Sequence, residues 1–171
     1  MTADANEDTS CPYVVGDDGL ARWSGLEADA WLGLQRTHRL LTRELERALA
    51  GRYGLSLSAL ELLGRLAAAD RRRMRLSTLA ETVGLSLSRV SRIVDALERR
   101  GLVARQACNE DARATNAWLT DAGLRLTREA QATHFADVQR QFFDQLSDRD
   151  VRALADVFAR LAPGVVTGRA A

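Results

Sequence analysis

Two short helical patterns lie close together near the middle of the chain, with a glycine between them. Residues 77–83 carry an apolar helical pattern that ends at Gly84. Ser86, a favoured N-cap residue, begins a second pattern that runs to Arg100 and ends at Gly101. Two helices joined by a turn of about three residues that contains glycine have the spacing of a helix-turn-helix. The sequence therefore predicts such a unit over residues 77–100.

Two further helices are predicted before this unit. Apolar residues recur at intervals of three and four over residues 23–53, and Gly54 ends that pattern. The spacing Ser58-Ala-Leu-Glu61 is that of a capping box, so a second helix is expected to begin at Ser58. Residues 70–73 (Asp-Arg-Arg-Arg) follow it and are expected to form a charged loop.

The pattern changes to strand after Gly101. A β-hairpin is predicted from residues 102–105 and 114–119, with the polar stretch 109–113 as its tip. Thr120 is expected to cap a long helix that ends near Leu146. A last helix is predicted from the cap at residues 147–150 to Leu161.

The charges of the chain are segregated, although the formal net charge is only +1. All 24 basic residues are arginine. Residues 71–113 carry ten of these arginines against five acids, whereas residues 1–21 carry five acids and no arginine. One concentrated basic block in a nearly neutral chain favours a local anionic partner, most commonly nucleic acid. Residues 1–22 lack any periodicity and are predicted to be a flexible acidic tail.

The second helix of the unit, residues 86–100, carries the proposed chemistry. At 100° per residue its apolar residues fall in one sector, which is expected to be buried: Val90, Ile93, Val94 and Leu97. A helix of this length spans about 22 Å, and its diameter fits the major groove of B-DNA, which is roughly 12 Å wide. Arginine can bridge the O6 and N7 atoms of guanine, small serines allow close approach, and the helix N-terminus suits a phosphate. The candidate DNA contacts are Ser86, Ser88, Arg89, Ser91 and Arg92.

Further contacts are predicted outside this helix. At the hairpin tip, Asp111 is expected to orient Arg113, whose guanidinium suits the negative potential of a narrow minor groove. Arg73 and Arg75, with the neighbouring arginines of the charged loop, are candidate phosphate contacts. Asp95 also lies on the exposed side of the helix, and its expected partner is Arg99 one turn later. The alternative for each of these charges is a solvated surface.

Four segments together resemble the MarR family of winged-helix transcriptional regulators. They are LAE at 79–81, LSLSRVSRIVDALERRGLV at 85–103, DAR at 111–113 and LTDAG at 119–123. The resemblance implies a mainly α fold with a small β-hairpin wing. In that fold a winged helix-turn-helix DNA-binding lobe (58–119) is joined to a helical dimerisation region (23–57 and 120–163).

The same resemblance implies a function. The expected protein is a cytoplasmic homodimer that binds a palindromic double-stranded DNA operator, acts most often as a repressor and is released by a small-molecule effector. By the family pattern, helix 86–100 enters the major groove and Arg113 the minor groove. Apolar stripes on the first and last two helices are too large for the small lobe to cover, which independently favours a partner chain.

Two other functions stay open at this point. Cys108, just before the hairpin tip, favours a redox-sensing regulator, although neither Cys11 nor Cys108 lies where the oxidation-sensing branch of the family has its cysteine. A helical adaptor that binds protein and not DNA is the second alternative. The sequence has no Gly-rich phosphate loop and no Gly-x-Ser-x-Gly motif, so no enzyme is expected.

No cofactor, metal or membrane contact is predicted. His38 and His134 are the only histidines, and a zinc site needs several converging ligands. No apolar run approaches the roughly 18 residues that a membrane span requires.

Overall fold

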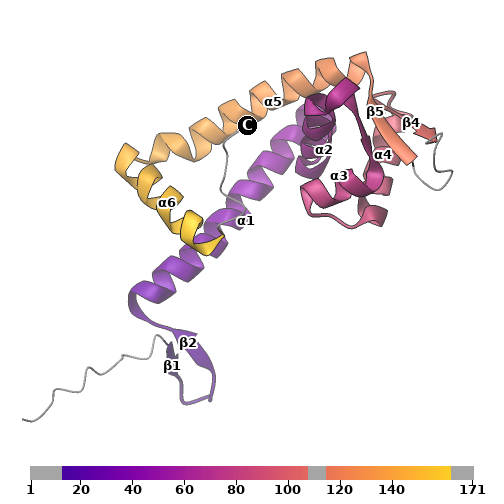
Figure 1. The fold of residues 1–171 in the computed structure, drawn as a ribbon. Helices are drawn as coiled ribbons and strands as arrows, with labels where there is room; N and C mark the ends of the chain where they lie inside the picture. Colours follow the sequence, from indigo (N-terminus) through magenta and orange to yellow (C-terminus); the bar gives the residue numbers. More distant parts are fainter. Residues whose placement is uncertain (1–12, 108–114, 163–171) are drawn as a thin grey trace, which may run out of the picture. The chain divides into compact units, whose positions relative to one another are not determined.

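A computed structural model describes residues 13–107 and 115–162 of the chain. Within them the fold is mainly α-helical with two small antiparallel sheets, which confirms the predicted class (Figure 1). The chain divides into two compact units, residues 1–43 and 44–171. The helix α1 (Gly25–Tyr53) begins in the first unit and ends in the second.

The described part of the first unit starts with a hairpin. Strands β1 (Tyr13–Val15) and β2 (Ala21–Trp23) pair antiparallel, with Tyr13 opposite Trp23. The prediction of a flexible tail as far as residue 22 is therefore wrong for residues 13–22, and residues 1–12, with Cys11, lie outside the described part. The connecting turn holds the strands together: the Asp18 carboxylate accepts hydrogen bonds from the Leu20 amide (3.0 Å) and from the Arg22 guanidinium.

The second unit begins within α1, at residue 44, and includes the end of that helix. Gly54, with φ of +61°, reverses the chain, and α2 (Leu57–Ala68) follows. Its N-cap is Ser56, whose hydroxyl accepts from the Ala59 amide at 3.1 Å. The predicted capping box at Ser58 is wrong, because the Glu46 carboxylate accepts from the Leu57 amide at 3.1 Å and supplies the second cap from α1.

The helix-turn-helix follows the predicted bounds closely. A 3₁₀ turn (Asp70–Arg72) leads into a three-residue strand, β3 (Arg73–Arg75), where only a loop was expected. Helix α3 (Leu76–Val83) ends at Gly84, whose φ of +65° is the left-handed conformation that glycine adopts at a helix end. Helix α4 (Leu87–Arg99) then starts from Ser86.

A three-stranded sheet closes the lobe. Strands β4 (Val103–Ala107) and β5 (Thr115–Leu119) form the predicted hairpin, and β3 pairs with the other edge of β5. The sheet order is β3-β5-β4. The tip of the hairpin, with the predicted site residues Asp111 and Arg113 and also Cys108, lies outside the described residues.

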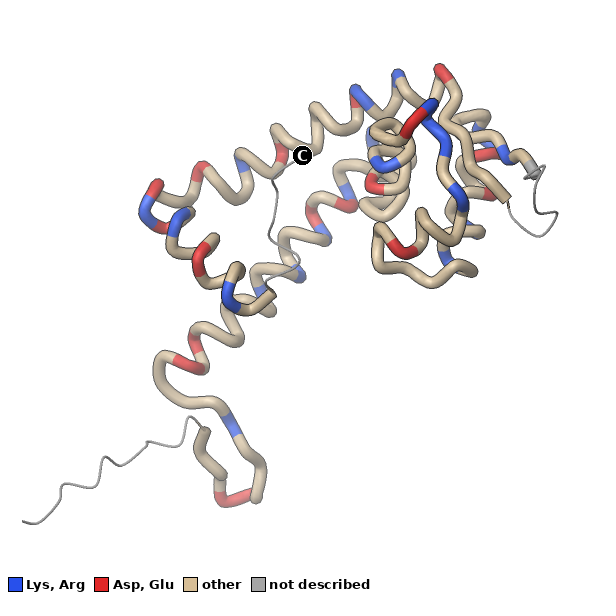
Figure 2. The backbone as a smooth tube through the Cα atoms, viewed as in Figure 1, with Lys and Arg blue, Asp and Glu red and all other residues tan. Residues whose placement is uncertain are grey.

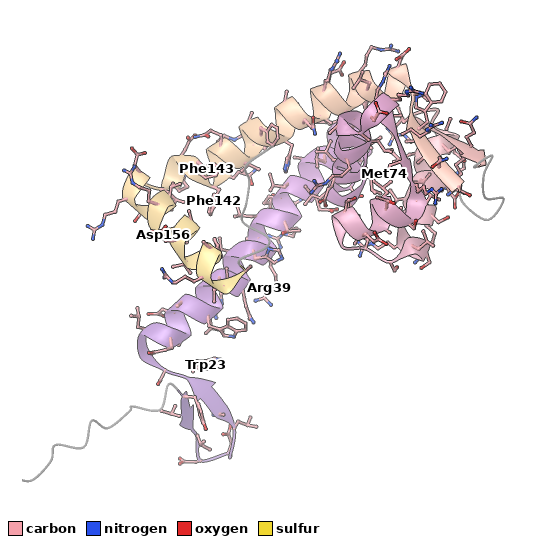
Figure 3. The ribbon with its side chains drawn as sticks, in the orientation of Figure 1. Trp23, Arg39, Met74, Phe142, Phe143 and Asp156 are labelled. Carbon is pink, nitrogen blue, oxygen red and sulfur yellow. The ribbon has the colours of Figure 1, made fainter. Side chains whose placement is uncertain are left out.

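Two helices follow the sheet within the described residues. Thr120 caps α5 (Asp121–Gln141), which ends before the predicted Leu146 because a 3₁₀ turn (Phe143–Gln145) follows. Ser147 and Asp150 form a reciprocal capping box at the start of α6 (Asp148–Leu161), which confirms the cap predicted there. At the junction, the Phe142 and Phe143 rings pack edge to face, with centroids 5.1 Å apart (Figure 3).

The core of the second unit is built mainly by α2, α3, α4 and the sheet. The most deeply buried residues, each 2% exposed or less, include Leu62, Leu63, Leu66, Leu79, Val90, Val94, Val103 and Leu119. Val90, Val94 and Leu97 are buried and Ile93 is half-buried, as predicted for the inner face of α4. Burial of this face fixes which residues of α4 point outward.

Candidate nucleic-acid interface

The N-terminal half of α4 is presented to solvent. The Ser86 hydroxyl accepts from the Arg89 amide at 3.4 Å and lies 3.4 Å from the Ser88 hydroxyl. Ser86, Ser88, Arg89 and Arg92 are all exposed. The Arg92 Nε donates to the Ser88 carbonyl at 3.4 Å, which leaves its Nη groups at the outer end of the side chain. Four of the five residues predicted on this helix therefore share an accessible surface.

Ser91, the fifth, is engaged within the protein. Its carbonyl and hydroxyl oxygens accept hydrogen bonds from Arg105 Nη2 at 2.9 and 3.1 Å. Arg105 belongs to β4, so this contact joins the helix to the sheet. Ser91 is half-buried at this junction.

Arg105 also holds the two acids of α4. Its Nη2 lies 2.7 Å from Asp95 Oδ1, and its Nε lies 3.7 Å from Glu98 Oε2. The Arg105 amide donates to Glu98 Oε1 at 3.0 Å. The predicted pairing of Asp95 with Arg99 is therefore wrong, because an arginine on the neighbouring strand reaches the carboxylate. With its side chain only 26% exposed, Arg105 is a support for the helix.

Two more arginines of the basic block serve the fold. Arg100 donates from Nη1 to the Gly54 carbonyl and from Nη2 to the Tyr53 carbonyl, both at 2.7 Å. It thereby caps the C-terminal end of α1, where unsatisfied carbonyls favour a cation. Arg72 forms an ion pair of 2.8 Å with Asp121 at the start of α5. These partners lie 46 to 49 residues away in sequence, so local patterns could not reveal them.

Arg73 and Arg75 lie on the edge strand β3. Both side chains are exposed, and the intervening Met74 turns toward the core. Figure 2 shows that the lobe containing α3 and α4 carries several basic positions. The alternation of a three-residue strand therefore presents two guanidinium groups on one side of the sheet edge.

The base of the wing is joined to α5 by close backbone packing. Thr120 donates from Oγ1 to the carbonyls of Gly101 (2.8 Å) and Leu102 (3.1 Å) and accepts from the Gly123 amide at 3.0 Å. A Cβ atom at Gly123 would lie 2.1 Å from the Leu102 carbonyl oxygen and 2.7 Å from Leu119 Cδ1. Only glycine allows α5 to approach the hairpin this closely.

A hollow of about 470 Å³ lies between α2 and α5. Its lining combines apolar and polar side chains, among them Leu60, Glu61, Gln131, His134 and Phe135. The His134 Nδ1 atom is buried and has no hydrogen-bond partner among the described residues. Burial lowers the pKa of the His134 imidazole, and the negative charge of Asp137 opposes this shift. The imidazole is therefore favoured in its neutral form.

Side-chain contacts also join the end of α1 to α5. The Tyr53 hydroxyl lies 2.6 Å from Thr133 Oγ1. The Asp137 carboxylate is 4% exposed and pairs with Arg140 at 2.5 Å and with Arg52 at 3.9 Å. These contacts connect the end of α1 to the middle of α5.

The described ranges contain neither a cluster of metal ligands nor a helix suited to span a membrane. Over residues 13–107 and 115–162, no three His, Cys, Asp or Glu side chains gather in a way that would hold a metal ion. None of the helices in that part of the chain is both long and apolar enough to cross a bilayer.

Comparison with known proteins identifies relatives that cover most of this chain. The family model described as "MarR family" matches residues 55–115. The uncharacterized HTH-type transcriptional regulator YdgJ of Bacillus subtilis is 31% identical over 142 residues, which cover 83% of this chain and 82% of YdgJ. The HTH-type transcriptional repressor YetL of the same organism is 28% identical over 137 residues, covering 78% of this chain and 81% of YetL.

Several solved structures of MarR family regulators are also similar to this chain in sequence and fold. AbsC, a MarR family transcriptional regulator from Streptomyces coelicolor, is 35% identical, with a TM-score of 0.75 over 83% of this chain and 96% of AbsC. Sco3205 from the same organism, solved in complex with DNA, is 31% identical, with a TM-score of 0.76 over 87% of this chain and 94% of its own. CouR from Rhodococcus jostii RHA1, bound to p-coumaroyl-CoA, is 26% identical, with a TM-score of 0.65 over 86% of this chain and 99% of CouR.

Proposed function

Because the chain belongs to the MarR family of transcriptional regulators, we propose that it binds a palindromic duplex operator as a homodimer and represses the adjoining genes. It is a regulator and not an enzyme. The DNA complex of Sco3205 and the repressor YetL support this function in relatives of comparable length.

The observation that carries the proposal is the outward face of α4. Its inner face is fixed by buried Val90 and Val94, so Ser88, Arg89 and Arg92 face solvent together. Arg105 pairs with the acids at positions 95 and 98 and offsets the charges that would repel DNA. A helix with small and cationic residues at its exposed N-terminal end suits the major groove, where arginine can read guanine.

The remaining contacts divide by role. Ser86, at the N-cap of α4, and Arg73 and Arg75, on β3, contact phosphates and position the lobe. Arg113, oriented by Asp111, enters the minor groove. Ser91 supports α4 through Arg105 and is not assigned a base contact.

The homodimer uses the helices outside the lobe. Residues 23–57 and 120–163 form the dimerisation region, and residues 58–119 form the DNA-binding lobe. Large apolar side chains exposed on these helices support this division: Trp31 (47%), Phe143 (40%) and Leu161 (70%). A two-fold axis would place the two copies of α4 about one helical turn of DNA apart.

An effector that releases the operator completes the proposal. The hollow between α2 and α5 connects a helix of the lobe to a helix of the dimerisation region, and it has the size and mixed lining of a small-molecule site. CouR, a relative of the same fold, was solved with an acyl-CoA ligand.

Selection of bound sites from a random pool of duplex DNA tests the proposed function. We expect recovery of one motif with two inverted half-sites whose centres lie about 10 base pairs apart or a multiple of that distance. Recovery of unrelated sequences would contradict sequence-specific binding. Recovery of a single unrepeated site would contradict the two-fold arrangement.

Replacing Arg92 with alanine is expected to weaken binding to the selected duplex by about 1–3 kcal/mol, because a bidentate contact to guanine is lost. Binding to random duplex should change much less. Fluorescence anisotropy at fixed salt measures both affinities. Arg152→Ala, which removes an exposed arginine from α6, is the matched control and should change neither affinity. An equal loss on both duplexes would show that Arg92 contacts only phosphate.

A further inference from the structure

The β1–β2 hairpin has one apolar face. Residues alternate between the two faces of a strand, and Tyr13 lies opposite Trp23 while Val15 lies opposite Ala21. These four side chains therefore share one face. The Tyr13 and Trp23 rings meet edge to face, with centroids 6.4 Å apart and an angle of 88° between their planes.

The other face and the turn are more polar. Val14 lies opposite Arg22 on that face. The Arg22 guanidinium pairs with Asp18, and this hydrogen bond lowers the pKa of the Asp18 carboxyl and raises the pKa of Arg22. The hairpin is thus amphipathic, which is the pattern of a sheet that packs on one side only.

Nothing within its own unit covers the apolar face. Tyr13 is 44% exposed, Val15 62% and Trp23 47%. None of residues 13–43 is buried, although this segment contains two tryptophans and many leucines. A lone two-stranded hairpin is at best marginally stable in water, so an ordered hairpin of this kind needs a surface to pack on.

The hairpin is continuous with α1, which the proposed homodimer places in its dimerisation region. Trp23 is followed within two residues by Gly25, where φ of +59° turns the backbone into α1. The first half of α1 exposes Leu26 (79%) and Trp31 (47%), and it belongs to the region assigned above to the homodimer. A second copy of this chain carries the same uncovered face, so a two-fold interface buries both at once.

We propose that the apolar face of the β1–β2 hairpin packs against a second copy of this chain and extends the homodimer interface beyond the helices. This inference rests on the homodimer of the proposed function. The hairpin then acts as a clamp between protomers, with the face of Tyr13, Val15, Ala21 and Trp23 turned toward the partner and the face of Val14 and Arg22 turned toward solvent.

A pair of substitutions at neighbouring positions tests the orientation. Val15→Glu places a charge on the apolar face, and Val14→Glu places the same charge on the opposite face of the same strand. In full-length protein, sedimentation equilibrium should show the dimer dissociation constant raised at least tenfold by Val15→Glu and less than threefold by Val14→Glu. Equal effects of the two variants, or no effect of either, would overturn the proposal.

A crosslinking experiment identifies which molecule packs against the apolar face of the hairpin. A photoreactive benzoylphenylalanine in place of Tyr13, in an equal mixture of isotope-labelled and unlabelled chains, should give products that join one labelled and one unlabelled chain. Crosslinks found only within single chains would overturn the proposal, and so would crosslinking in cell extract only to a different protein.

The experiments distinguish an error in the proposed hairpin contact from an error in the proposed homodimer. A dimeric wild-type protein whose dissociation constant is unchanged by Val15→Glu overturns the hairpin contact alone. A wild-type protein that stays monomeric at all concentrations overturns both.

Discussion

Replacing Gly123 with alanine should lower the free energy of unfolding by about 3 kcal/mol, because the new Cβ has no space. It would lie 2.1 Å from the Leu102 carbonyl oxygen. That oxygen cannot move away easily, since it also accepts from the Thr120 amide and hydroxyl, each at 3.1 Å. Urea denaturation followed by circular dichroism measures the loss.

Gly51→Ala is the matched control. Gly51 lies inside α1, and a Cβ there meets nothing within 4 Å. Alanine is the better helix former by about 1 kcal/mol, so this variant should be neutral or slightly more stable. If both glycine variants changed stability by the same amount, the tight approach of α5 to the hairpin would be contradicted.

Arg105→Ala is expected to weaken binding to the selected operator by about 2 kcal/mol, roughly 30-fold, without unfolding the protein. Two effects combine. The carboxylates of Asp95 and Glu98 lose their cation beside the DNA, and α4 loses its hydrogen bonds to β4. Anisotropy titrations on operator and on random duplex measure the change.

Further variants separate the two effects. Arg105→Lys should restore only the part of operator affinity that depends on charge, because an ammonium offsets the carboxylates but cannot reproduce the fork to Ser91 and Asp95. Adding Asp95→Asn and Glu98→Gln to Arg105→Ala should restore affinity for random duplex, since the repulsion is gone, while the preference for operator stays reduced. Full recovery of that preference would contradict a positioning role for Arg105.

Local signals predicted the elements that depend on local chemistry. Gly84 and Gly101 end helices with positive φ, and Ser86 and Thr120 cap the helices that follow. The buried stripe of α4 was visible as a helical repeat, because burial of one face imposes that period. These features were sufficient for the fold class and for the accessible residues of α4.

Features that depend on distant partners were not predictable in this way. Strand β3 has only three residues, and its pairing partner β5 lies about 40 residues later. Ser56 and Ser58 both suit an N-cap, and the choice depends on Glu46 of the preceding helix. The hairpin at residues 13–23 depends on a turn that Asp18 and Arg22 close.

The predicted DNA contacts also divide into residues whose exposure follows from local sequence and residues that depend on distant partners. Exposure of Ser88, Arg89 and Arg92 follows from the helical period alone. Arg72, Arg100 and Arg105 look equally available in sequence, yet each is held by a carboxylate or carbonyl from another element. The spacing of Asp95 and Glu98 is the one sequence signal that could have indicated a shared cation, since residues three apart lie on one helix face.

Methylation interference on the selected operator tests the central claim, the placement of α4 in the major groove. Guanine N7 lies in that groove. We predict that N7 methylation within each half-site reduces wild-type binding at least tenfold, and that the Arg92→Ala protein loses this sensitivity at the base that Arg92 reads. Wild-type binding that is indifferent to N7 methylation in both half-sites would contradict the claim.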